Sequence, residues 1–431
     1  MPSEKNPIAP NKPEAAPQTQ MLRLGLLSNS ARLAQLNHHI TNLQLPILTT
    51  LALTAVLNKT LLLLTNNGGG DLLGADIPKA LMLLNGDNPY TIVPWAAPYP
   101  PFHLLLIAGI IQLTNAIAPA TTINAISTNI RVVAVLADLG IAFLIYLTLR
   151  ARHQTGLNLI LPTGLFLLLP SISSNPYFFF HTDTFGYTIL AGALFALTTR
   201  HHTTGTTLLA TATIFKLHPI LAIPLVLTWL TRTQGIRKVL PSLVATTTIL
   251  TLGLVAPLAI PGYSDTILGF NLSTGFGNGT SSFTILNLFY AILPNTAAIT
   301  LPLQAINQIW IITTTTLFTV VLLTIRARPD TFQPVDIALL GLLVWLLPLR
   351  QLYTQYIVWA TIPLLMRGRL KETILLAGLL ELANTMAVWS WGVNPNPFPA
   401  MTTIYGFFLT SLAYLAWNTA ALALTLKRQQ P

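Results

Sequence analysis

The chain has 431 residues, of which 52% are apolar and only 8% are charged, about a third of the ~25% typical of globular domains. This composition excludes an ordinary soluble protein, and apolar runs of about 18 or more residues recur throughout, so it predicts an all-α polytopic membrane protein. The net charge of +10 comes from short Lys and Arg clusters at the ends of apolar runs, which indicates cytoplasmic flanks beside anionic membrane lipid and argues against a nucleic-acid partner.

Residues 1–44 are polar and proline-bearing, and we expect a cytoplasmic tail without a cleavable signal peptide. Residues 45–427 are expected to form the membrane domain, a bundle of roughly ten to thirteen spans. The basic clusters place both termini in the cytoplasm. The candidate spans are 45–65, 100–118, 126–149, 155–171, 183–199, 204–230, 239–260, 303–325, 335–349, 352–366, 371–391 and 401–426, with a shorter apolar piece at 284–293.

The basic pair Arg150 and Arg152 conflicts with a simple count of crossings. If both are cytoplasmic, three apolar runs lie between two cytoplasmic points, which is an odd number. Either one of these runs does not cross the membrane, or the two arginines lie outside. The sequence leaves both arrangements open.

Two loops are expected on the extracytoplasmic side, at about 66–99 and 261–283. The first holds three of the twelve acidic residues of the chain and should contain a short amphipathic helix that begins near Asp76. Asp76 is either the N-terminal cap of this helix, as Pro78 in its first turn suggests, or a functional carboxylate. Asp71, which follows three glycines, is the next candidate, and Asp87 is expected in a turn.

Charged residues inside apolar runs also require an explanation, because such charges are usually paired or functional. Arg131 and Asp138 share one helical face about 10 Å apart along the axis, so each should pair with another helix. Lys216 is followed at once by His218 and Pro219, so we expect a broken helix there, with the lysine either facing a substrate or satisfying the break.

A third polar group lies in the late run "WLLPLRQLYTQY". Part of the set Arg350, Tyr353 and Gln351 or Gln355 can share one helical face, and a guanidinium beside hydroxyls and amides is a suitable receptor for phosphate. The alternative is an aromatic and basic belt at the membrane interface. Glu381 receives no functional role and is interpreted as a helix-packing contact.

Taken in order, these segments resemble the GT-C superfamily of integral-membrane glycosyltransferases, and within it the polyprenyl-phosphomannose-dependent mannosyltransferases. That family has an aspartate in the first extracytoplasmic loop, then G-x-x-P-Y and Y-x-P-P, later K-x-x-P, and finally a basic residue followed by tyrosines. The matching segments are Asp76, Gly86–Tyr90, Tyr99–Phe102, Lys216–Pro219 and Arg350–Tyr356, and the likeness covers roughly residues 45–366. The chain departs from the pattern at residues 181–183, which read His-Thr-Asp where the family has Gly-Gln-x-Asp or Gly-Gln-x-Asn.

The resemblance implies transfer of a sugar, which is mannose in the members it resembles most, from a polyprenyl- or dolichyl-phosphate carrier to a hydroxyl of a lipid-linked or glycan acceptor, with inversion. Such a reaction needs one base, and cations rather than a general acid for the phosphate that leaves. Asp76 is the expected base, and the expected donor- and phosphate-binding residues are Lys216, His218, Arg350 and Tyr353. The expected substrate-binding residues are Asp71, Tyr90, Tyr99, His181, Asp183 and Gln355.

No His, Cys or Asp cluster has metal-ligand spacing, and the first loop lacks D-x-D, which predicts a metal-independent reaction without a cofactor. The active site is expected on the extracytoplasmic face of a membrane, with a prokaryotic cell membrane favoured over the endoplasmic reticulum. Two alternatives stay open. A transporter or flippase of a polar lipid would use the same charges but would show internal repeats. A glycan polymerase or ligase would carry its active site in a large late loop.

Overall fold

The structure is a computed structural model that describes residues 39–65, 72–91, 99–169, 182–268, 303–346, 354–368 and residue 374. Within these ranges all regular structure is helical, as the composition predicts. The predicted spans 371–391 and 401–426, the apolar piece 284–293 and Glu381 lie outside the described residues. The main helices are α2 (Gln44–Thr65), α3 (Ile77–Leu84), α4 (Pro101–Ile117), α5 (Ile123–Ala151), α6 (Leu157–Leu168), α8 (Asp183–Thr198), α9 (His202–Phe215), α10 (Ala222–Gln234), α11 (Ile236–Leu250), α12 (Tyr263–Leu268), α14 (Leu303–Ala327), α15 (Pro334–Leu346) and α16 (Thr354–Met366).

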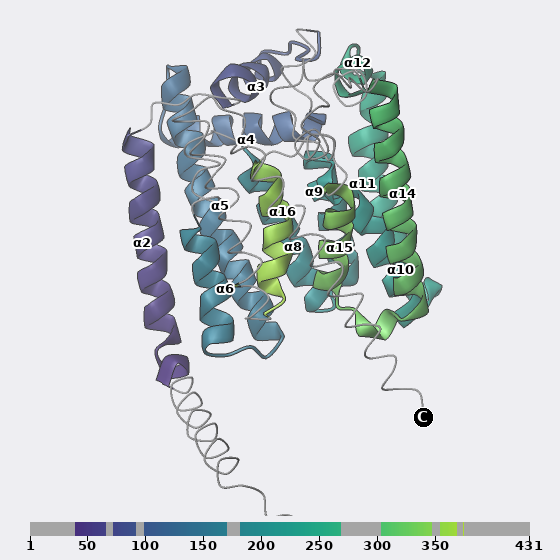
Figure 1. Ribbon diagram of the computed structural model, residues 1–431. Coiled ribbons are helices and arrows are strands. Elements are labelled where there is room, and N and C mark those ends of the chain that lie inside the picture. Colours follow the sequence, from purple (N-terminus) through teal and green to yellow (C-terminus); the bar gives the residue numbers. More distant parts are fainter. Residues whose placement is uncertain are drawn as a thin grey trace, which may run out of the picture.

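Most of these helices run along a common direction and form a bundle around α8 (Figure 1). Helix α8 packs against α5, α9, α15 and α16, and most of its side chains are buried. Helices α8 and α15 are apolar on every side, which is the pattern of a helix at the centre of a large helical protein. The core of the bundle therefore lies around these two helices.

Helix α4 does not run along the bundle, although the sequence predicted a span over 100–118. Figure 1 shows α4 lying across one end of the bundle, beneath α3. Its buried residues recur at spacings of three and four, so one face rests on the bundle while the other is exposed. An apolar run of this length looks the same in sequence whether it crosses a bundle or covers its end. We call this the α3–α4 end.

The single span predicted over 204–230 is also wrong, because the chain folds back on itself there. Helix α9 ends at Phe215, a 3₁₀ turn (His218–Leu221) follows, and α10 begins at Ala222. The rings of His202 in α9 and Trp229 in α10 lie 6.3 Å apart. In one continuous helix these residues would be about 40 Å apart, so α9 and α10 form an antiparallel hairpin. The predicted break at Pro219 is confirmed, but it is the tip of a hairpin and not a kink.

The basic pair that complicated the count of crossings lies at the end of the bundle opposite to α3 and α4. Arg152 donates a 2.7 Å hydrogen bond to the carbonyl of Met366, and the next residue, Arg367, pairs with Asp336 at 2.5 Å. The basic ends of α5 and α16 therefore share one end of the bundle. Together with the transverse position of α4, this favours the arrangement in which one of the three apolar runs does not cross.

Three stretches of the described chain are long and apolar enough to cross a membrane: α2, α5 and the continuous helical segment Ile236–Ala259. Helix α2 and the segment Ile236–Ala259 are poorly buried within the protein and expose many large apolar side chains. Such surfaces are unusual in water and ordinary in lipid.

The first of these helices is attached to the bundle by a buried ion pair. Lys59 of α2 donates to Asp138 of α5, and both side chains are almost fully buried. The prediction that Asp138 pairs with another helix is therefore confirmed, with a partner that the sequence did not indicate. Arg131 Nη2 lies 3.3 Å from Thr128 Oγ1 on its own helix.

Candidate active site

Asp76 lies where a short π-helical turn (Leu72–Asp76) continues directly into α3. The capping role that the sequence left open is wrong, because the side chain makes no capping hydrogen bond. A helix that continues from a preceding turn has few unsatisfied N–H groups left to cap. The carboxylate is buried, with 1% of the residue exposed, and Thr182 Oγ1 donates to its Oδ2 over 2.8 Å.

His103 is the second neighbour of this carboxylate. It lies in the first turn of α4, a helix that Pro100 and Pro101 begin at a fixed position. His103 Nε2 is 3.3 Å from Asp76 Oδ1 and 3.0 Å from Thr182 Oγ1. Thr182 uses its one hydroxyl hydrogen on Asp76, so His103 Nε2 must carry the proton in the contact with Thr182. The three side chains therefore form a closed and buried group.

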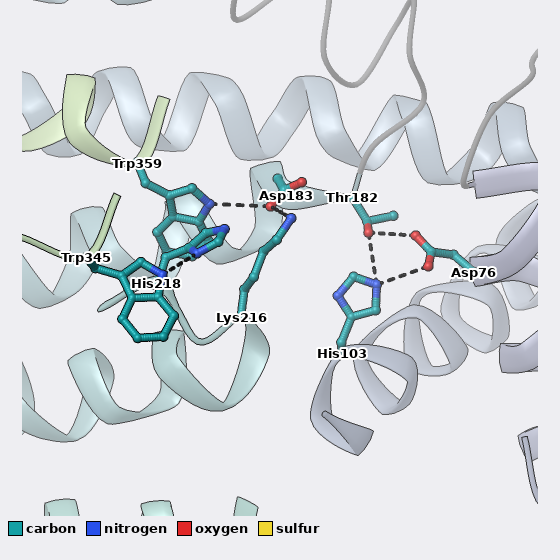
Figure 2. A network of polar contacts seen from close by, with 8 residues as sticks. All are labelled: Asp76, His103, Thr182, Asp183, Lys216, His218, Trp345 and Trp359. Atoms are coloured by element: carbon teal, nitrogen blue, oxygen red, sulfur yellow. Dashed lines mark hydrogen bonds and ion pairs between the residues drawn. The ribbon is translucent and has the colours of Figure 1, made fainter. Parts of the chain in front are cut away.

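Asp183, the residue after Thr182, begins a second group. Lys216 at the hairpin tip donates to Asp183 Oδ1 over 2.6 Å, and Trp359 Nε1 lies 3.4 Å from the same oxygen. Figure 2 shows the two groups side by side, joined through the adjacent residues 182 and 183 at the start of α8. Gly186 makes this packing possible, since a Cβ there would lie 2.8 Å from the Trp359 ring.

Tyr99 connects the two groups a second time. Its ring stacks on His103 with centroids 4.4 Å apart, and Lys216 Nζ lies 5.1 Å from the centroid of the same ring. The Tyr356 ring lies 4.7 Å from Lys216 Nζ. The ammonium group is thus held by one carboxylate and two aromatic rings, an arrangement that stabilises a cation away from water. Asp76 and Lys216 consequently belong to one polar site.

His218 completes the site at the hairpin tip. Trp345 Nε1 donates to His218 Nδ1 over 3.1 Å, so the proton of the neutral ring lies on Nε2. This buried Nε2 makes no hydrogen bond within the described part of the chain. The position of the tip is fixed by Gly341 of α15, where a Cβ would lie 2.5 Å from Ala222 Cα. His218 therefore offers one unused donor inside the bundle.

Tyr90, predicted to bind substrate, supports the backbone of a neighbouring segment. Its hydroxyl donates to the carbonyl of Tyr99 over 3.2 Å, and its ring meets Tyr263 edge-on at 5.1 Å. Burial raises the pKa of the Tyr90 phenol well above its usual value. The residue thus fixes the backbone of Tyr99 rather than presenting a free hydroxyl. Asp87 lies in the exposed turn after α3, as predicted.

Four predicted site residues, Asp71, His181, Arg350 and Tyr353, lie outside the described residues. Gln355 lies in the first turn of α16. The remaining ones, Asp76, Asp183, Lys216, His218 and Tyr99, are brought together at the α3–α4 end and just below it.

Sequence reasoning did not assign a role to His103, Thr182 or Trp359, although all three contact the predicted residues. A signal was present for His103, which follows the Tyr-Pro-Pro motif directly, and for Thr182, which lies inside the His-Thr-Asp triplet. Trp359 had no such signal, because its contact with Asp183 depends on the packing of α16 against α8.

Chemically, the site combines a buried carboxylate with a paired lysine and an unused imidazole donor. No three His, Cys, Asp or Glu side chains are close enough together to hold a metal ion in the residues that the structure describes. The metal-independent reaction stays a prediction. Neither protein-family models nor curated proteins match this chain.

Proposed function

We propose that the protein is a membrane glycosyltransferase of the GT-C type. It moves a sugar from a polyprenyl- or dolichyl-phosphate carrier to a hydroxyl of a lipid-linked or glycan acceptor, with inversion. The proposal includes a bundle of roughly ten to thirteen spans and mannose as the sugar, as the resemblance in sequence implies.

The observation that carries the proposal is the state of Asp76. One carboxylate oxygen accepts a hydrogen bond from Thr182, while Oδ1 makes no hydrogen bond within the described residues and lies 3.3 Å from His103 Nε2. A buried carboxylate that is fixed through one oxygen and lacks a hydrogen bond at the other is suited to accept a proton from a substrate hydroxyl.

The reaction step follows from this geometry. The acceptor oxygen attacks the anomeric carbon of the donor sugar, and its proton passes to Asp76 Oδ1. The bond between the anomeric carbon and the phosphate oxygen breaks, and its electron pair leaves with the polyprenyl phosphate. The remaining Nζ hydrogens of Lys216 and the Nε2–H of His218 are donors for that phosphate, which needs charge stabilisation and no proton. No metal is used in these steps.

The setting of the site supports a reaction at one membrane face. The Asp76 group lies at the α3–α4 end (Figure 1), and the basic ends of α5 and α16 lie at the other. Because basic residues flank cytoplasmic ends, this arrangement supports an extracytoplasmic site. The exposed apolar surface of α2 and of Ile236–Ala259 supports contact with lipid along the length between these ends.

The test is transfer of radiolabelled mannose from a polyprenyl-phosphate donor by the purified full chain in lipid nanodiscs. We expect Asp76→Asn to lower the rate by about 10² to 10⁴, the range for loss of a general base, while the protein stays folded. Asp87→Asn is the matched control, because it removes an exposed carboxylate of the same segment, and it should retain wild-type activity.

Full activity of Asp76→Asn would contradict the assignment of the base. Absence of transfer from every polyprenyl-phosphate sugar tried, combined with movement of labelled lipid between leaflets, would instead identify a flippase. Products in which many sugar units have been added to one acceptor would identify a polymerase.

A further inference from the structure

Lys79 differs from the other buried lysines of the described chain. It lies in α3 one helical turn after Asp76 and is only 4% exposed. The other two, Lys59 and Lys216, each donate to a carboxylate. Lys79 Nζ makes no hydrogen bond within the described residues.

An unpaired ammonium group in such a position costs free energy, because burial removes its water without replacing the lost hydrogen bonds. Burial lowers the pKa of Lys79, and the nearby carboxylate of Asp76 partly opposes this effect. A side chain in this state gains more from an anionic ligand than a solvated surface lysine does. The absence of a partner within the described chain therefore points to a partner outside it.

The position of Lys79 indicates whether its anionic partner belongs to the sugar donor or to the acceptor. In an inverting transfer the acceptor hydroxyl and the leaving phosphate lie on opposite sides of the anomeric carbon. Asp76 is on the acceptor side by definition, since it takes the proton of the hydroxyl. Residues three apart on a helix have Cβ atoms about 5–6 Å apart, so Lys79 shares the side of Asp76. The leaving phosphate is instead served by Lys216 and His218 at the hairpin tip.

We propose that Lys79 binds a phosphate group of the acceptor, close to the hydroxyl that receives the sugar. The inference rests on the proposed function and deepens it, because it names the acceptor class: an anionic lipid whose phosphate is near its reactive hydroxyl. Asp76 then binds the acceptor hydroxyl, which donates a hydrogen bond, and Lys79 binds the neighbouring phosphate, which is an anion. A neutral glycan would leave the ammonium group unpaired.

The first experiment measures binding without catalysis. Wild type and Lys79→Met are placed in phosphatidylcholine nanodiscs, and thermal unfolding is followed with phosphatidylinositol added to the disc or with inorganic phosphate in solution. We expect phosphatidylinositol to raise the Tm of the wild type and leave that of Lys79→Met unchanged. A rise with inorganic phosphate alone would assign the site to free phosphate and overturn the lipid acceptor. Equal rises in both proteins would overturn the role of Lys79.

The substitution itself gives a second readout. Methionine keeps the length of the side chain and removes the unpaired charge, so Lys79→Met without ligand should unfold at the same temperature as the wild type or higher. A lysine that served only to hold the fold would give the opposite result. A clearly lower Tm of the unliganded variant would therefore overturn the proposal.

The second experiment measures transfer from a radiolabelled polyprenyl-phosphate mannose donor to membrane lipids separated by anion exchange into neutral and anionic fractions. We expect label in the anionic fraction only, and a KM for that fraction about tenfold higher in Lys79→Met with little change in kcat. Transfer to neutral lipid with an unaffected variant would overturn this inference and leave the proposed function standing. No transfer by the wild type would overturn the proposed function, while the binding experiment would still decide whether Lys79 holds phosphate.

Discussion

Two buried ion pairs of this protein have the same chemistry and very different surroundings. Lys59 and Asp138 join two uninterrupted helices, α2 and α5. Lys216 and Asp183 lie where helices end, at the tip of the α9–α10 hairpin and at the first residue of α8. The second pair is also enclosed by the rings of Tyr99 and Tyr356 and adjoins the group around Asp76.

The difference teaches that a buried charge indicates function only together with its backbone context. Lys59 and Asp138 neutralise each other between continuous helices, where the backbone hydrogen bonds are made within each helix. A pair at interrupted helices lies beside backbone and side-chain groups that are incompletely satisfied, such as the Nε2–H of His218. Substitutions at three places, taken from the largest expected effect to the smallest, test this comparison.

The largest effect is expected at the α2–α5 pair. Asp138→Leu leaves Lys59 buried without its carboxylate, which should cost about 3–5 kcal/mol of stability. The double variant Lys59→Met with Asp138→Leu removes both charges and should regain most of this loss, with wild-type transfer activity. Thermal unfolding of the purified proteins measures both effects. A double variant as unstable as the single one would show that the pair does more than attach α2.

The second variant applies the same double substitution to the pair at the hairpin tip. Lys216→Met with Asp183→Leu should regain stability relative to either single change, because no buried charge is left without a partner. Transfer should nevertheless stay about 10² lower than in the wild type, since a donor to the leaving phosphate is lost. Initial transfer rates and Tm values of the single and double variants are compared with those of the wild type. If transfer activity recovered together with stability, the Lys216–Asp183 pair would have only a structural role, like the Lys59–Asp138 pair.

The smallest effect is expected at His103, which we interpret as a positioning residue for Asp76. His103→Leu removes the N–H beside Asp76 and Thr182 and should cost about 1–2 kcal/mol of transition-state stabilisation, roughly 5–30-fold in rate. His103→Gln keeps an N–H donor and should recover most of the rate, seen in kcat rather than in KM. Equal losses in both variants would assign the imidazole itself, and not its N–H, to the reaction.

Much of the helical fold was predictable, because long apolar runs and basic ends mark helices directly. The helix from Gln44 and the break at Pro219 both follow from such local signals. The direction of the chain between helices was not predictable. Composition along 100–118 or 204–230 does not reveal whether a run crosses the bundle, covers its end or folds back, since that depends on which faces find partners in space.

The candidate site was predictable to the extent that its charges interrupt apolar sequence. Lys216 and His218 stand out for this reason, and Asp76 stands out because its loop holds three of the few carboxylates of the chain. Thr182 is a common neutral residue whose importance comes only from its contacts. Lys79 was overlooked because it lies in a predicted loop segment, where lysine is usually solvated, whereas Lys59 lies within the predicted span 45–65 and was a usable signal. Their burial is a property of the packed bundle.

The Lys59–Asp138 contact also has a consequence for the order in which the chain matures. Its two residues are 79 positions apart, so at synthesis rates of about 5–20 residues per second Lys59 is made roughly 4 to 16 s before Asp138. During that interval Lys59 of α2 lacks the carboxylate of Asp138. The ion pair that attaches helix α2 to the bundle can thus form only after Asp138 of α5 has been made.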